Sequence, residues 1–241
     1  TRAKNADGKW VLPFDPYYSE HDPDKAMFTE GNSWQHSWFV PQDVYGLIAA
    51  HGGDAKFIGK LDSLFTVSSQ LTGANVSNDI SGLIGQYAHG NEPSHHIAHL
   101  YNYAGMPFKS AERASYIAKN LYTTKPDGLC GNEDCGQMSA WYVFTAMGFY
   151  PVNAASGEYV IGSPLLNETK LKMSSGKTFR LTAKNLTDKN IYVQSATLNG
   201  KPYTKSFITH GDMQKGGELV LMMGARPSLS WGVKPADRPG K

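Results

Sequence analysis

The sequence has few cysteines, no long apolar run and no excess of charge of one sign. Among 241 residues, 23 are Lys or Arg and 21 are Asp or Glu, so the formal net charge is only +2. These charges are scattered, and the basic run that a nucleic-acid binder needs is missing, so no nucleic-acid partner is expected. No apolar stretch approaches the roughly 20 residues that cross a bilayer as a helix, so no membrane span is predicted.

The two cysteines, Cys130 and Cys135, bracket a polar, acidic loop. They lack the second pair and the histidine partners that a zinc site would require. A local disulfide and two free thiols both remain open, because the compartment decides between them. The first eight residues are polar and the chain starts at Thr1, which we interpret as a processed or truncated start.

What the sequence does contain is enough apolar material for one large domain or two small ones, since 40% of its residues are hydrophobic. Aromatic residues make up 12% of the chain, and many stand next to polar residues. This arrangement is typical of sugar-binding enzymes, because a pyranose has an apolar face and a rim of hydroxyls. Ordinary core and surface aromatics explain the composition equally well.

Helical signals fill the first part of the chain after an extended, proline-rich segment over residues 1–24. Apolar residues at helical spacing predict helices over residues 41–50, 54–65, 95–105, 110–123 and 139–148. Asp54 and Ser110 are expected to cap two of these helices, and Gly148 to end the last one.

After Pro151 the apolar period becomes alternating, which predicts strands over residues 159–161, 169–173, 179–183, 191–196 and 218–223. Asn199-Gly200 predicts a tight hairpin. We therefore expect two parts, a helical part over residues 1–152 and, over residues 153–241, an antiparallel sheet that is a sandwich or part of one.

Three polar loops carry carboxylates and lead into helical segments, with Glu30 in the first, Glu92 in the second, and Glu133 and Asp134 in the third. Two carboxylates across a sugar pocket suffice to hydrolyse a glycosidic bond. Glu30 is near Trp34, and an aromatic wall would favour its protonated form, whereas amides of the third loop could keep Asp134 ionised. For each acid taken alone, a helix cap or surface charge is the simpler reading.

The second loop also offers oxygen ligands for a metal ion. The Asn91 amide and the Glu92 carboxylate are hard donors of the kind that Ca²⁺ prefers. A zinc site at His89, His95 and His96 is a weaker hypothesis, because consecutive residues point to different faces of a helix. A helix start with Pro93 at its first position is the structural alternative for this loop.

At these loops the sequence closely resembles glycoside hydrolase family 92, the calcium-dependent exo-acting α-mannosidases. The resemblance is carried by EGNSWQ (30–35), WFVPQD (38–43), HGNEPSHH (89–96), LYNYAG (100–105), GNEDCGQMSAWY (131–142), GFYPV (148–152), IGSPL (161–165) and QSATLNGK (194–201). Together these motifs span nearly the whole chain.

The resemblance implies an inverting hydrolase that removes terminal mannose, with Glu30 as general acid and Asp134 as general base. The family often has a second Asp two residues before the base, where this chain has Asn132, which can still orient a water. The resemblance also assigns Asn91 and Glu92 to a Ca²⁺ site that bridges two mannose hydroxyls. Substrate contacts are expected from four residues: Trp34, Tyr87, His89 and Glu133. Tyr87-Ala88 replaces the His-Glu of members specific for α-1,2 linkages, which favours another linkage.

Family members join an N-terminal β-sandwich to an (α/α)6 barrel, and this chain is long enough for about half the barrel and the terminal strands. We therefore expect an α+β fragment whose partners are a mannose-containing glycan and either the N-terminal half of the enzyme or another copy of the chain. The resemblance implies a bacterial periplasmic, cell-surface or secreted location. Two rival hypotheses are a family member that acts on mannose-1-phosphate linkages, against which Glu30 in place of a Gln argues, and a non-catalytic glycan-binding or structural fragment.

Overall fold

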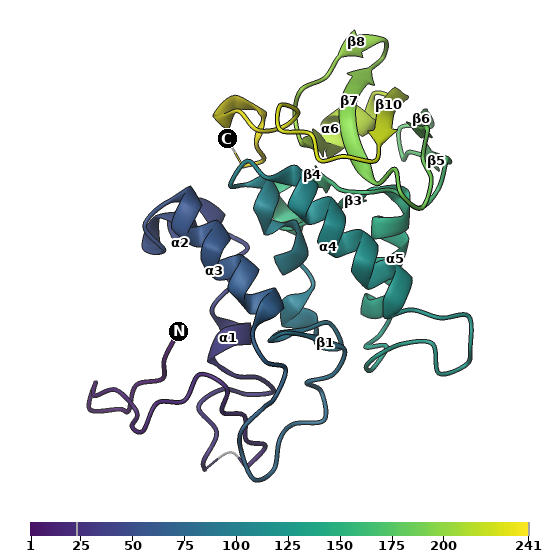
Figure 1. Ribbon diagram of the computed structural model, residues 1–241. Coiled ribbons are helices and arrows are strands. Elements are labelled where there is room, and N and C mark those ends of the chain that lie inside the picture. Colours follow the sequence, from purple (N-terminus) through teal and green to yellow (C-terminus); the bar gives the residue numbers. More distant parts are fainter. Residues whose placement is uncertain (23, 241) are drawn as a thin grey trace.

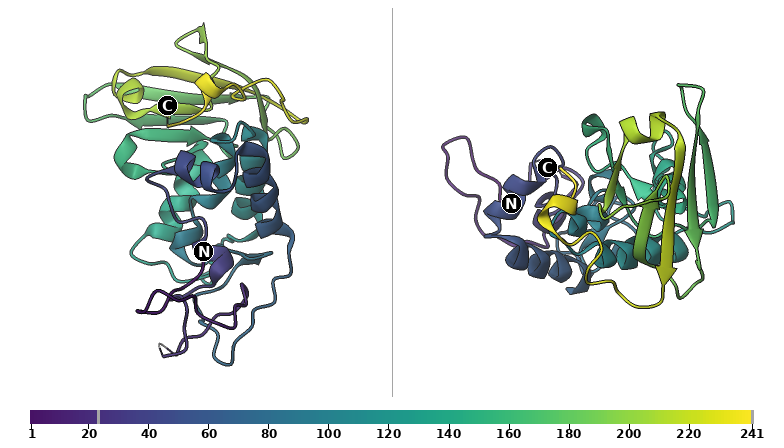
Figure 2. Two further views of the ribbon diagram at one scale, coloured as in Figure 1. Left: turned by 90° about the vertical axis from the view of Figure 1, so that its left-hand side faces the viewer. Right: turned by 90° about the horizontal axis from the view of Figure 1, so that it is seen from above.

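The structure is a computed structural model that describes residues 1–22 and 24–240. Residues 23 and 241, which belong to the predicted extended segment and the predicted β region, lie outside the described residues. The helices form a middle layer, with a region of coil and loops on one side and the β-sheets on the other (Figures 1 and 2). The fold is therefore mixed α+β.

The helical layer contains most of the predicted helices. Its elements are α1 (Ser33–His36), α2 (Val44–Ala50), α3 (Asp54–Thr66), the 3-10 helices η1 (Glu92–Ser94) and η2 (Ile97–Asn102), α4 (Pro107–Asn120) and α5 (Gln137–Met147). Three further short helical elements follow: η3 (Ala154–Ser156), α6 (His210–Gln214) and η4 (Pro235–Asp237). No helix of the described residues is both long and apolar enough to cross a membrane.

Several helix starts differ from the predicted ones for local reasons. The Asp43 side chain accepts a hydrogen bond from the Gly46 amide, so α2 starts at Val44. Asp54 is the first residue of α3, and not its cap. The cap predicted at Ser110 is wrong, because Pro107 occupies the first turn of α4 and Ser110 is buried inside the helix. The Gly148 cap is confirmed, since this residue ends α5 in the left-handed conformation (φ 98°).

Two sheets and one hairpin contain the strands. The hairpin pairs β1 (Leu83–Ile84) with β2 (Tyr87–Ala88). A three-stranded sheet has the order β3 (Phe149–Tyr150), β4 (Glu158–Ile161), β9 (Phe207–Thr209). A five-stranded sheet has the order β5 (Glu168–Lys172), β6 (Thr178–Lys184), β10 (Gly217–Gly224), β7 (Tyr192–Leu198), β8 (Lys201–Pro202). The predicted Asn199-Gly200 hairpin joins β7 to β8, and both turn residues have positive φ.

The purely antiparallel arrangement predicted for this region is wrong at one strand pair. β10 inserts between β6 and β7, pairing antiparallel with β7 and parallel with β6. The turn signals in the sequence specify only neighbouring strands, so they could not reveal this long-range insertion. The burial pattern within β10 is the predicted one, because Leu219, Leu221 and Met223 all point into the core.

Two hydrophobic clusters hold these layers together. One lies among the helices and contains Trp38, Phe57 and Trp141, and the other lies under the large sheet and contains Phe179 and Leu221. The partly buried Phe144 side chain of α5 packs against both clusters. Because α5 runs from the loop region to the sheet, the acidic loop before it lies at the end of the helical layer away from the sheet (Figure 1).

Candidate active site

The three acidic loops meet at one place, and the loop of Glu92 contacts both of the others. The Asn91 side-chain amide donates a hydrogen bond to the backbone carbonyl of Glu30 at 2.8 Å. On the other side Gly90 and Gly131 touch backbone to backbone, and a Cβ atom at Gly131 would lie 2.5 Å from the Gly90 carbonyl oxygen. Only glycine permits this approach, so these residues bring together loops that are far apart in the sequence.

Hydrogen bonds from buried histidines also hold these loops in place. His96 donates from Nε2 to the Trp38 carbonyl at 2.8 Å, beside the first loop. His95 donates from Nε2 to the His89 carbonyl, so its Nδ1 accepts the hydrogen bond from Gln137, the first residue of α5. Burial lowers the pKa of His95 and of His96 to about 4, so both rings are neutral. These histidines serve as structural links, and the described residues contain no group of three or more His, Cys, Asp or Glu arranged to hold a metal ion.

The Glu92 carboxyl of the second loop has one buried oxygen atom, Oε1, without a hydrogen-bond partner among the described residues. Its Oε1 is shielded from solvent and accepts no hydrogen bond within the described part of the chain. Loss of hydration, together with the neighbouring carboxyls of Asp134 and Glu30, raises the pKa of Glu92. The carboxyl groups of Asp134 and Glu30, from the two other loops, therefore lie close enough to influence Glu92.

These residues fit a hard cation. The Asn91 amide nitrogen donates to the Glu30 carbonyl, which leaves its Oδ1 free to act as an oxygen ligand, and the unpartnered Oε1 of the adjacent residue Glu92 offers a second oxygen. Ca²⁺ takes six to eight oxygen ligands, so water, sugar hydroxyls or other protein groups would supply the rest. A cation would also offset the like charge at Glu92.

The backbone is strained at both predicted catalytic residues. Glu30 has φ 51° and Asp134 has φ 50°, and Cys135 follows Asp134 in the same left-handed region with φ 55°. Such conformations cost non-glycine residues on the order of 1–3 kcal/mol each and gather at functional sites. Three of the five described non-glycine residues with positive φ thus lie in the acidic loops.

Comparison with known proteins identifies the family. Residues 1–225 match the sequence profile of the glycosyl hydrolase family 92 catalytic domain. The chain belongs to glycosyl hydrolase family 92. An uncharacterized secreted glycosidase from Arthroderma benhamiae is 35% identical over 213 residues, which are 87% of this chain and 25% of that protein.

Solved structures of family 92 enzymes superpose on the whole chain. An α-mannosidase from Bacteroides thetaiotaomicron in complex with mannoimidazole is 41% identical, with a TM-score of 0.91 and coverage of 100% of this chain and 32% of that one. An inverting mannosidase from the same organism is 38% identical, with a TM-score of 0.84 and coverage of 99% and 33%. The chain thus spans between a quarter and a third of the length of these relatives.

In this family 92 chain, Glu30 and Trp34 lie differently from the prediction. The Glu30 side chain is exposed, so the expected desolvation by an aromatic wall is absent. The Trp34 ring instead makes a cation–π contact with the Lys60 ammonium, which lies 3.5 Å from the ring centroid. Trp34 lines a cavity of about 560 Å³ together with Trp10 and Phe14, which leaves it available for contact with a sugar.

The Glu133 side chain is bound to the backbone at the start of α5. Its carboxylate accepts hydrogen bonds from the backbone amides of Gly136 and Ser139 at the start of α5. Hydrogen bonds from Ser139 and Gly136 lower the pKa of Glu133. These hydrogen bonds fit the simpler alternative, a carboxylate that stabilises the start of a helix, and the substrate contact of Glu133 stays a prediction.

Tyr87 and His89, for which the sequence predicts contact with substrate, are held inside the described part of the protein. The Tyr122 hydroxyl donates its proton to the Met138 carbonyl, so its oxygen accepts a hydrogen bond from His89 Nε2 at 2.7 Å. His89 Nδ1 therefore carries no proton and accepts a hydrogen bond from the Tyr87 hydroxyl at 2.8 Å. Burial lowers the pKa of His89 to about 2. Both residues are fully buried, at and just before the start of the second loop.

Asn132 and Asp134 are exposed at the surface of the third loop. The Asn132 side chain donates a hydrogen bond to Asp79. The sequence indicates no role for Asp79. The two residues are 53 positions apart and no sequence motif links them, so this contact could be identified only from the structure. The two cysteines of this region are free, with Cys135 exposed.

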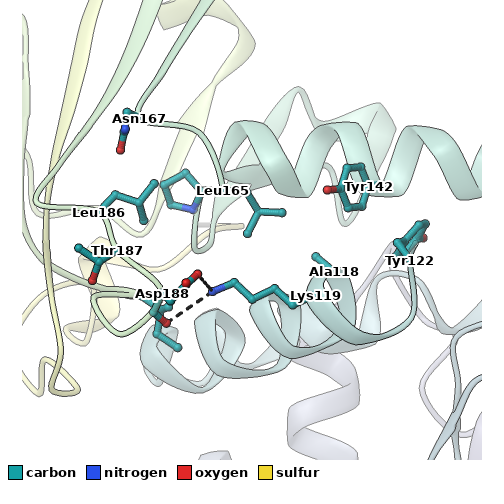
Figure 3. Close-up of a pocket in the computed structure, with 11 residues that line it drawn as sticks. Ala118, Lys119, Tyr122, Tyr142, Leu165, Asn167, Leu186, Thr187 and Asp188 are labelled. Atoms are coloured by element: carbon teal, nitrogen blue, oxygen red, sulfur yellow. Dashed lines mark hydrogen bonds and ion pairs between the residues drawn. The ribbon is translucent and has the colours of Figure 1, made fainter. Parts of the chain in front are cut away.

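A cavity of about 630 Å³ lies elsewhere, between α4, α5 and loops of the β region (Figure 3). Tyr122 and Tyr142 lie at one end, and the Lys119 ammonium binds the Asp188 carboxylate at 3.2 Å at the other. None of the predicted site residues lines this cavity, so it is separate from the acidic loops.

Proposed function

We propose that this chain carries the general acid, the general base and the calcium ligands of an inverting exo-α-mannosidase that releases terminal α-linked mannose from glycans. The observation that carries the proposal is the convergence of Glu30, Glu92 and Asp134 from three separate loops. The names of the neighbouring structures, an α-mannosidase and an inverting mannosidase, support this substrate and stereochemistry.

In the proposed reaction Glu30 donates its proton to the glycosidic oxygen as the bond to the anomeric carbon breaks. A water attacks that carbon from the opposite face and gives up a proton to Asp134, while Asn132 orients the water. The product is β-mannose, since the configuration inverts once. Both carboxyl side chains are exposed, so a sugar could reach them.

We further propose Ca²⁺ as the cofactor, with Asn91 and Glu92 among its ligands. When bound, the ion supplies positive charge that orients the sugar hydroxyls. Glu92 contributes the carboxylate whose Oε1 is otherwise unpartnered, and Asn91 contributes an amide oxygen while its nitrogen keeps the Glu30 loop in place.

The helices are proposed to be part of an (α/α)6 barrel completed by the N-terminal half of the enzyme or by another copy of the chain. Large side chains on the outer faces of α4 and α5 support this, because Tyr116 is 52% and Val143 53% exposed. A periplasmic, cell-surface or secreted location is proposed as well, supported by the name of the secreted relative.

The test compares Glu30→Gln and Asp134→Asn with Glu133→Gln in the enzyme assembled with its upstream region. The first two variants are expected to lose at least about 1000-fold in turnover with little change in stability, because each removes a proton-transfer group. Glu133→Gln is the matched control, since it weakens a helix cap by about 1 kcal/mol without removing a reacting group. Full turnover by Glu30→Gln would refute the assignment, and glycan binding without release of mannose by the unmodified enzyme would favour a binding fragment.

A further inference from the structure

The side chain of Asn132 is anchored to a carboxylate outside the three acidic loops. Its Nδ2 donates a hydrogen bond to Asp79 Oδ1 at 3.1 Å. An amide must present its nitrogen, and not its oxygen, to a carboxylate, so this contact fixes which way the Asn132 amide faces. Oδ1 of Asn132 therefore points away from Asp79 and can accept a hydrogen bond.

Asp79 is itself held in a fixed position. Its Oδ2 accepts a hydrogen bond from the hydroxyl of the buried Ser77 at 2.9 Å, and Ser77 Oγ accepts one from the Asp79 amide. The same turn continues to Ser81, whose carbonyl accepts from the Gly90 amide at 3.0 Å. Asp79 is thus joined through its own turn to the loop of Glu92.

The charge of Asp79 is not shared with a cation. No ion pair involving Asp79 occurs among residues 1–22 and 24–240. Its hydrogen bond to Asn132 therefore joins a full carboxylate charge to a neutral amide, which makes the bond stronger and polarises the amide oxygen.

We propose that Asp79 is a positioning residue for the hydrolytic water and acts through Asn132. This inference rests on the proposed function. Asn132 Oδ1 accepts a hydrogen bond from one O–H of the water, and Asp134 takes the proton of the other as the oxygen attacks the anomeric carbon. Asp79 keeps its charge throughout, takes no proton and touches no substrate.

The test exchanges the Asp79 and Asn132 side chains in the enzyme assembled with its upstream region. Asp79→Asn preserves the hydrogen bond but removes the charge, so kcat should fall about 5-fold with KM unchanged, because a charged partner adds about 1 kcal/mol over a neutral one. Asn132→Asp places two carboxylates against each other and should lower kcat further. The double variant Asp79→Asn/Asn132→Asp restores one carboxylate bound to one amide, so its kcat should exceed that of both single variants.

A purely structural role for Asp79 predicts that the variants change the free energy of unfolding but leave the kcat of the folded enzyme unchanged. Asn78→Ala, an exposed neighbour in the same turn, is the matched control and should keep the kcat of the unmodified enzyme. All rates are measured below the unfolding midpoint of the least stable variant. Unchanged kcat in Asp79→Asn, or a double variant no faster than both single variants, would overturn the inference. The proposed function is tested separately by Glu30→Gln, which must be inactive for the comparison of Asp79 variants to concern this reaction.

Discussion

The buried histidines should make the fold sensitive to mild acid, and His96 offers the clearest case. Its Nε2 donates to the Trp38 carbonyl at 2.8 Å, and burial lowers its pKa to about 4 from the ordinary 6.5. Between these two values the unfolded chain binds a proton that the folded chain does not. Stability contributed by His96 is therefore complete above about pH 6.5 and is lost as the pH falls toward 4.

The size of the effect follows from the pKa difference. Each pH unit within this window is equivalent to about 1.4 kcal/mol, so at pH 5 a single histidine of this kind destabilises the fold by about 2 kcal/mol. Burial also lowers the pKa of His89, His95 and His99, to about 2, 4 and 3. The whole set should thus remove several kcal/mol, a large part of the stability of an ordinary domain.

His96→Gln isolates the contribution of one ring, because a glutamine amide can reach the same carbonyl but does not titrate. Urea unfolding of the unmodified chain and of this variant is compared at pH 7 and pH 5. The loss of unfolding free energy between the two pH values should be smaller in the variant by about 2 kcal/mol. His210→Gln, an exposed site, is the control and should leave the difference unchanged. An identical pH dependence in His96→Gln and in the unmodified chain would show that His96 is not buried in its neutral form.

Three further predictions concern the loops and the sheet. Gly131→Ala should separate the second and third loops and destabilise the fold by about 1–3 kcal/mol, seen as a lower unfolding midpoint, because its Cβ would lie 2.5 Å from the Gly90 carbonyl oxygen. Addition of Ca²⁺ should raise the melting temperature and a chelator should reverse this, whereas Glu92→Gln should abolish the response; an equal response in that variant would remove Glu92 from the site. Gly200→Ala should cost about 1 kcal/mol of stability without a change in turnover, because Gly200 has φ 77° in the β7–β8 hairpin, far from the acidic loops.

Features set by neighbouring residues were predictable from the sequence. The Asn199-Gly200 turn, the end of α5 at Gly148 and the alternation along β10 each depend on a few consecutive residues and are confirmed. The parallel pairing of β10 with β6 was not predictable, because it depends on which strands separate in sequence become neighbours.

The candidate site shows the same division. The sequence motifs indicated the loops of Glu30, Glu92 and Asp134, and the structure brings these loops together. The direction of each side chain depends on tertiary contacts, so the helix cap at Glu133 and the burial of His89 could not be read from the motifs. The contact of Asp79 with Asn132 joins distant loops and has no signature in the sequence.

We propose that the three loops form the catalytic centre of a calcium-dependent inverting α-mannosidase. The most direct measurement follows the anomer released from α-1,2-, α-1,3- and α-1,6-mannobiose by proton NMR, with Ca²⁺ and then with a chelator, using the enzyme assembled with its upstream region. We expect that β-mannose appears first, that the chelator stops its release, and that Glu30→Gln releases none. First appearance of α-mannose, or release that continues unchanged in Glu30→Gln, would contradict this proposal.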